Sequence, residues 1–303
     1  MENRLAVIDL GTNTFHILIA EANGSGGFKE IVRYRQFIKL AEEGIEKIGD
    51  APFQRGLAAL QYFSLLMQEE KVSKIKAFGT AALRTASNGQ DFIKAAKETT
   101  GIDIQLISGD EEARLIYKGV NQAVPPAPER MLIMDIGGGS VEFIIADHST
   151  IYWAQSFPIG VAVLFNRFHH SSPIKKEEIT MVEDFLKDHL SPLEAALRQF
   201  PCRKLVGASG TFDVLEALVV KEKDNPIYSH FDAQLFFPLY EELIQTSLEE
   251  RYEMESIPAS RAEMIIVAVI LIKYVLELGQ IPFISVSAYA MKEGILVEML
   301  EEI

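Results

Sequence analysis

Two short segments, residues 9–14 and 135–140, share a pattern of residue types that can hold a phosphate group beside a metal ion. The first reads Asp-Leu-Gly-Thr-Asn-Thr and the second reads Asp-Ile-Gly-Gly-Gly-Ser, with the two aspartates 126 positions apart. Turns of glycine, asparagine and small hydroxyl residues expose backbone N–H groups, and a missing Cβ lets an anion come close. An aspartate beside such a turn is placed to hold a hard cation, directly or through water.

Either turn alone would be interpreted as an ordinary hairpin whose aspartate satisfies its own backbone. Repetition at domain spacing favours the phosphate interpretation, because it indicates two halves built alike. Each turn lies between two apolar runs, so we expect strand, tight turn and strand in both halves, with the two turns facing each other. The predicted phosphate-binding residues are Gly11, Thr12, Asn13, Thr14, Gly137, Gly138, Gly139 and Ser140, and the predicted metal ligands begin with Asp9 and Asp135.

The composition predicts a soluble, globular, cytoplasmic protein with enough apolar residues for two cores. The chain has 303 residues, of which 48% are hydrophobic, and a single cysteine, Cys202, which excludes an internal disulfide. The N-terminus enters a strand without a signal peptide, and the most apolar run, residues 264–272, is too short to span a bilayer.

The net charge of −14 argues against general affinity for nucleic acid. A phosphorylated substrate is still compatible with this charge, provided that cations are concentrated locally. One basic cluster, formed by Arg33, Arg35 and Lys39, is either a solvated strand face or a track for substrate, and the sequence leaves both open.

The predicted elements alternate between strands and helices. In the first half we expect strands at 15–22, 28–36, 75–80 and 104–107, and helices at 52–70, at 90–99 and from 110. In the second half a strand at 204–207 accompanies helices at 174–199, at 234–249, at 260–278 and from 288. The proline-rich stretch 124–128 marks the boundary between domains 1–124 and 125–303, and the last helix, about 288–303, can pack back on the first domain.

Four motifs occur along the chain in the same order as in a known protein family. They are residues 9–14, 108–114 (Ser-Gly-Asp-Glu-Glu-Ala-Arg), 135–142 and 207–211 (Gly-Ala-Ser-Gly-Thr). From residue 5 to about 296 the chain resembles the exopolyphosphatase/guanosine pentaphosphate phosphohydrolase family of the actin-like superfamily. The resemblance implies an α/β fold of two actin-like (ribonuclease H-like) domains, each a mixed five-stranded sheet flanked by helices, with a cleft between them. It also implies a homodimer that uses water and magnesium, or manganese, to remove the terminal phosphate from polyphosphate or guanosine pentaphosphate.

The resemblance assigns the activation of water to Glu112, the second glutamate of Glu-Glu-Ala-Arg. Alone, this residue would be a first-turn helix glutamate interacting with the macrodipole, which is the role we expect for Glu111. Arg114 is expected to stabilise the segment 108–114 more than to contact the substrate. Glu142 either shares the metal with Asp135 or faces solvent, and the role of His16, its counterpart in the first half, is open.

The remaining predicted substrate contacts are less specific. The loop of Ala208, Ser209, Gly210 and Thr211 precedes a helix, where backbone N–H groups bind anions, although it is also compatible with a plain strand-to-helix turn. Arg84 offers a planar donor fork for phosphate but is equally compatible with a structural role. Arg261 and Lys292 match family positions in segments that depart from the pattern, with Glu263 for an aspartate and lysine for an arginine.

Two other functions compete with hydrolysis. An actin-like ATPase or small-molecule kinase would need an adenine pocket and an acceptor site, and no segment can be assigned to either. A non-catalytic sensor of polyphosphate or an alarmone would not need Glu112 together with both aspartates. Longer family members append a helical C-terminal region, so we expect this short chain to handle short polyphosphates relatively better.

Overall fold

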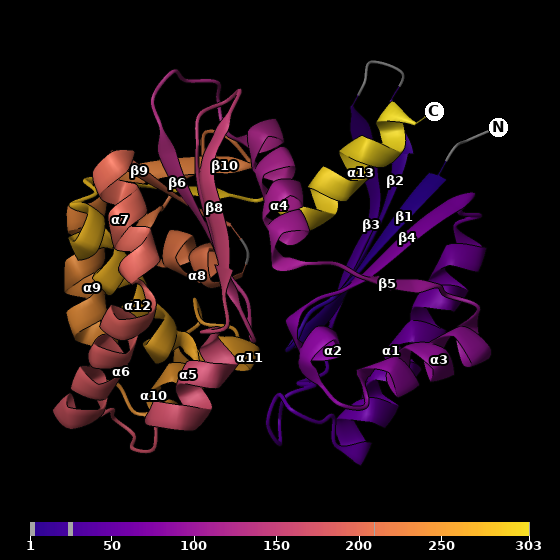
Figure 1. Ribbon diagram of the computed structural model, residues 1–303, viewed down its shortest axis with the longest axis horizontal. Helices are drawn as coiled ribbons and strands as arrows, with labels where there is room; N and C mark the ends of the chain where they lie inside the picture. Colours follow the sequence, from indigo (N-terminus) through magenta and orange to yellow (C-terminus); the bar gives the residue numbers. More distant parts are fainter. Residues whose placement is uncertain (1–3, 24–26, 209, 303) are drawn as a thin grey trace. The chain divides into compact units, whose positions relative to one another are not determined.

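The computed structural model describes residues 4–23, 27–208 and 210–302, which form two compact units (Figure 1). Unit 1 comprises Met1–Gly119, Gly137–Gly139 and Met291–Ile303, and unit 2 comprises Val120–Ile136 and Ser140–Ala290. Each unit has a hydrophobic core of its own.

Unit 1 is built on a five-stranded mixed sheet in the order β3-β2-β1-β4-β5. Its strands are β1 (Arg4–Leu10), β2 (Thr14–Ala22), β3 (Phe28–Phe37), β4 (Lys74–Gly79) and β5 (Ile104–Leu106). The first three strands form an antiparallel meander, whereas β4 and β5 run parallel to β1. Successive residues of β1 and β2 are buried, which indicates that both faces of the sheet are covered.

Helices cover both faces of this sheet. The helices α1 (Asp50–Glu69), α2 (Ala81–Thr85) and α3 (Gly89–Thr100) lie on one side, and α13 (Met291–Glu301) lies on the other, against β1 and β2 (Figure 1). The helix α4 (Gly109–Ala123) begins in unit 1 and runs past its boundary at Gly119. In α1 the buried side chains recur at helical spacing and pack on the sheet.

Unit 2 repeats this topology with one strand more than predicted. Its sheet runs in the order β10-β11-β9-β6-β7-β8, formed by β6 (Met131–Ile136), β7 (Val141–Ala146), β8 (Ile151–Phe157), β9 (Lys204–Ala208), β10 (Tyr228–Asp232) and β11 (Phe283–Ser287). The prediction of five strands was therefore wrong for this sheet. The sixth strand, β10, pairs antiparallel with β11 at the edge, and only two of its five residues are buried, so its apolar signal is weak.

The helices of unit 2 surround α12 (Ile265–Gly279), which is buried on nearly all sides and contacts α5 (Val161–Phe168), α6 (Lys176–His189), α7 (Ser191–Gln199) and α9 (Phe236–Leu243). The helix expected over 174–199 is two helices, because Pro192 lies in the first turn of α7 and cannot continue α6. The remaining elements are α8 (Gly210–Val219), a 3₁₀ turn (Ala233–Leu235), α10 (Leu248–Glu253) and α11 (Ala259–Ala262). Within the described ranges, no helix combines the length and apolar character needed to cross a membrane.

A glycine allows two helices of unit 1 to approach backbone to backbone. A Cβ built on Gly294 of α13 would lie 1.9 Å from the main-chain carbonyl oxygen of Leu115 on α4. A main-chain atom in the middle of a helix cannot move aside as the end of a flexible side chain can. The absence of a side chain at Gly294 therefore fixes how closely α13 packs.

We predict that Gly294→Ala lowers the free energy of unfolding by roughly 2 kcal/mol, because overpacking outweighs the higher helix propensity of alanine. Denaturant unfolding with the exposed Glu98→Ala of α3 as control, expected to change by less than about 0.5 kcal/mol, measures this. A Gly294→Ala protein at least as stable as the parent would contradict the close approach.

Candidate active site

The parallel strands of unit 1 bring several predicted site residues to one edge of its sheet. Leu10 at the end of β1 is paired with Gly79 at the end of β4, which is in turn paired with Leu106 at the end of β5. The first turn follows β1, α2 follows β4, and α4 follows β5. Consequently this edge of the sheet is followed by three predicted parts of the site: the turn of residues 11–14, Arg84 and Glu112.

The first turn is held by hydrogen bonds from the main chain on both of its sides. The Gly11 amide donates to the Thr14 carbonyl (3.1 Å). The carbonyl of Thr12 accepts from Leu40, and that of Asn13 accepts from both Ile38 and Lys39, at 2.7–3.0 Å. Because these bonds offset the partial negative charge of the carbonyls, the turn is better suited to an anion. The side chains of Thr12 and Thr14 are buried.

The glycines of the second turn belong to unit 1, and there is no room there for a side chain at two of them. A Cβ built on Gly138 would lie 2.8 Å from Cγ of Asn13, and one on Gly139 would lie 2.7 Å from Oγ1 of Thr12. Glycine is therefore required at these two positions by close approach. Ser140, the last predicted residue of this turn, is buried in unit 2.

Glu112 is a buried carboxylate beside an arginine. Its residue is 8% exposed, and Oε2 lies 3.6 Å from Nη1 of Arg84. The same Nη1 donates to the Ile107 carbonyl (2.6 Å), which fixes the guanidinium next to the start of α4. The guanidinium thus places a positive charge beside a carboxylate that, when ionised, can accept a proton.

Arg114 and Glu111 have the structural roles expected for them. Arg114 donates two hydrogen bonds to Glu111 (2.7 and 2.8 Å) and one to Glu298 of α13 (2.6 Å). Hydrogen bonding to Arg114 lowers the pKa of Glu111. These contacts connect α4 to α13, and they leave Glu112 as the buried member of the acidic pair.

Asp9 lies in a network of buried charges. Its carboxylate is 4.0 Å from Nζ of Lys292, and the next residue, Glu293, is fully buried and forms an ion pair with Arg33 at 2.8 Å. Burial raises the pKa of Asp9, an effect that Lys292 opposes and Glu293 reinforces. Burial lowers the pKa of Arg33, but Glu293 and Glu30 outweigh this effect and the net change is upward. Glu293 is not among the residues predicted from sequence, because a charged residue in a helix that carries other charges gives no sign of its burial.

The two predicted aspartates occupy equivalent positions in the antiparallel strand pairs of the two units. Asp9 is opposite His16 in unit 1, and Asp135 is opposite Glu142 in unit 2. Directly opposed residues of antiparallel strands have Cβ atoms roughly 4.5–5.5 Å apart on one face. Glu142 is 2% exposed and accepts a hydrogen bond from Ser156 (2.6 Å). Two neighbouring carboxylates with a hydroxyl form a hard-oxygen donor set that fits Mg²⁺.

The loop after β9 is also at a carboxyl edge, because Ala208 pairs with Asp135 in the parallel register of unit 2. Gly210 begins α8, and a Cβ built on it would lie 2.1 Å from Nη2 of Arg261, so the guanidinium covers the start of this helix. Thr211 is buried. Ser209 lies outside the described residues.

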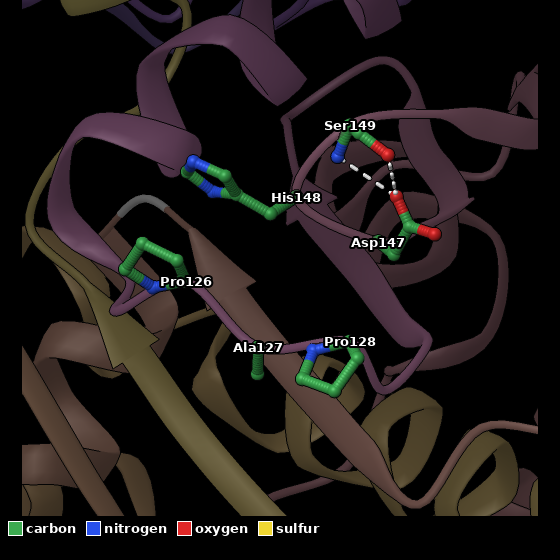
Figure 2. A pocket seen from close by; sticks show the side chains of 6 residues that line it. All are labelled: Pro126, Ala127, Pro128, Asp147, His148 and Ser149. Carbon is green, nitrogen blue, oxygen red and sulfur yellow. Dashed lines mark hydrogen bonds between the residues drawn. The ribbon is translucent and has the colours of Figure 1, made fainter.

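A shallow pocket of unit 2 contains none of the predicted site residues. Its lining comes from the proline-rich segment and the turn between β7 and β8, as Figure 2 shows: Pro126, Ala127, Pro128, Asp147, His148 and Ser149. Hydrogen bonds from Tyr152 (2.6 Å), Ser149 and Thr150 lower the pKa of Asp147. This carboxylate stabilises a turn.

The raised pKa of Asp9 predicts a pH-dependent stability. The folded state binds this proton more tightly than the unfolded chain, so ionised Asp9 reduces stability above its folded pKa, and the reduction disappears at low pH. The Tm of Asp9→Asn minus that of the parent should therefore increase as the pH rises above 3.8, the ordinary pKa of aspartate, in thermal unfolding. Exposed Asp188→Asn should show no such trend, and a difference that decreases with pH would contradict the burial of a charged Asp9.

Comparison with known proteins identifies the family and the fold. The model of the Ppx/GppA phosphatase family matches residues 18–303. A crystal structure of an exopolyphosphatase from Cytophaga hutchinsonii is 36% identical, with 99% of each chain covered and a TM-score of 0.94. The Ppx/GppA protein of Aquifex aeolicus is 24% identical, with 100% of this chain and 99% of that chain covered and a TM-score of 0.83, and it has the same fold. The predicted actin-like α/β fold is thus confirmed, and the chain belongs to the Ppx/GppA phosphatase family.

Proposed function

We propose that this protein hydrolyses the terminal phosphoanhydride bond of inorganic polyphosphate, with Glu112 activating the water. The observation that carries the proposal is the pairing of buried Glu112 with Arg84 at 3.6 Å, on the sheet edge that also carries the glycine-containing first turn. The full-length similarity to an exopolyphosphatase at 36% identity supports polyphosphate as the substrate.

The proposed reaction needs three contributions from the chain. The turns of residues 11–14 and 137–140 and the loop of residues 208–211 bind phosphate through backbone N–H and hydroxyl groups. Arg84 contacts the phosphate chain and orients Glu112, while Arg261 and Lys292 add positive charge. Glu112 accepts a proton as the water oxygen bonds to the terminal phosphorus, and the bridging P–O bond breaks to release orthophosphate and a chain shorter by one unit.

We further propose that Asp135 and Glu142 hold a magnesium ion. The part of the chain that the structure describes contains no cluster of three or more His, Cys, Asp or Glu suited to a metal. Magnesium commonly uses one or two carboxylates and completes its shell with water and substrate phosphates, which agrees with the opposed pair. The bound ion would offset negative charge on the phosphates. Asp9 is a less suitable ligand, because Lys292 beside it would repel a second cation.

Guanosine pentaphosphate is the alternative substrate of the same site, because its terminal bond is also a phosphoanhydride. A kinase or ATPase would instead require a nucleotide or an acceptor for turnover. A sensor would bind without turnover. The cytoplasmic location and the homodimer stay predictions.

Glu112→Gln should lower the rate of phosphate release by about 10²- to 10⁴-fold, because the amide cannot accept the proton. Glutamine keeps the size of the side chain, so substrate binding and Tm should change little. The matched control is the neighbouring Glu111→Gln, which removes the ion pair with Arg114 but leaves the proposed base intact. Phosphate release measured with tripolyphosphate decides this, and a Glu112→Gln enzyme as fast as the control would refute the assigned base.

Removal of divalent cation with a chelator should abolish turnover, and added Mg²⁺ should restore it. In Asp135→Asn and Glu142→Gln the Mg²⁺ concentration giving half-maximal rate should increase by about tenfold or more, because each variant loses one anionic oxygen ligand. Asp188→Asn, at an exposed position of α6, serves as the control. An unchanged Mg²⁺ dependence in both site variants would place the metal elsewhere.

A further inference from the structure

Lys39 has a backbone conformation that lysine rarely adopts. Among the described residues, three that are not glycine have positive φ: Lys39 (52°), Lys71 (52°) and Gln280 (48°). Lys71 follows the end of α1, and Gln280 follows the end of α12, where a left-handed residue is usual. Lys39 instead follows strand β3 and has no helix end to account for its conformation.

The first turn holds Lys39 in this conformation. The amides of Ile38 and Lys39 both donate to the carbonyl of Asn13, at 2.8 and 3.0 Å, and the next amide, that of Leu40, donates to Thr12 at 2.7 Å. The side chains of Ile38 and Leu40 are buried on either side of it. Lys39, which is only half-buried, is thus anchored next to the turn proposed to bind phosphate.

The residue type at this position is informative because other residues fit the backbone better. Glycine has no Cβ to strain the left-handed region, and asparagine tolerates it. Backbone strain of this kind, held by its surroundings, is often found at functional sites. A lysine at this position places a cation next to the first turn, where glycine or asparagine would fit the backbone with less strain.

The other two cations of the basic cluster have different environments. Arg33 forms ion pairs with Glu30 and with buried Glu293, and the guanidinium of Arg35 lies 5.6 Å from the centre of the Phe37 ring. Both therefore fit the interpretation of a structural or solvated strand face. Lys39 is the member that hydrogen bonds tie to the turn of residues 11–14.

We propose that Lys39 is a phosphate-binding residue, whose ammonium group contacts a phosphoryl oxygen of the polyphosphate chain at the first turn. This inference rests on the proposed function, because it assumes that the same turn binds phosphate. In a chain of net charge −14, a cation placed there would supply attraction that the rest of the protein does not.

The test compares two lysines with the same φ. Asparagine suits the left-handed backbone, so neither Lys39→Asn nor Lys71→Asn should lower the Tm. In a Glu112→Gln background, which allows binding without turnover, Lys39→Asn should weaken tripolyphosphate binding by about 10- to 100-fold in calorimetry. Lys71→Asn should leave binding unchanged, and Lys39→Arg should retain most of it because it keeps the charge.

The outcomes separate this inference from the proposed reaction. Specific loss of binding in Lys39→Asn, with its Tm retained, supports the role of Lys39 even where the parent enzyme releases no phosphate, and in that case only the proposed hydrolysis fails. Equal affinity in Lys39→Asn and its parent, an equal loss in Lys71→Asn, or no binding of tripolyphosphate to the Glu112→Gln parent would each overturn it.

Discussion

The parallel pairing of β1, β4 and β5 is the constraint on which the rest of the site in unit 1 depends. Parallel strands require crossovers, so the segments that follow the three strands begin at the same edge although they are far apart in sequence. The first turn, α2 with Arg84 and α4 with Glu112 are these segments. No local interaction among residues 9–14, 84 and 112 could bring them together without this register.

Charge is the second constraint. The protein is acidic overall, so a site that binds a polyanion must hold its basic side chains in fixed positions. The helix α13 contributes to this by bringing Lys292 and buried Glu293 against β1. Glu293 in turn holds Arg33 of β3, so one helix links the charges of two strands. The same helix binds Arg114 through Glu298, and Gly294 fixes its distance from α4. The last segment of the chain thus supports residues placed near its beginning.

Much of the fold could be predicted from sequence where patterns were local and strong. Apolar runs followed by turns located β1, β2 and β6, and helical spacing located α1. The predicted starts of α3 and α4 agree with the structure to within a residue or two. The strands β8, β10 and β11 were not predicted individually, and β10, at the edge of the sheet, has only two buried residues. The network of Asp9, Lys292 and Glu293 depends on tertiary packing, and the φ of Lys39 depends on hydrogen bonds to the first turn, so neither has a signal in the sequence.

The most direct test of the account is the release of orthophosphate from tripolyphosphate, guanosine pentaphosphate and ATP, each with Mg²⁺ and without any acceptor. Turnover of tripolyphosphate in the absence of nucleotide is the predicted result, with guanosine pentaphosphate as a second substrate of the same site. Release from ATP alone, or none from any of the three, would contradict the claim that these turns and Glu112 form a polyphosphate hydrolase.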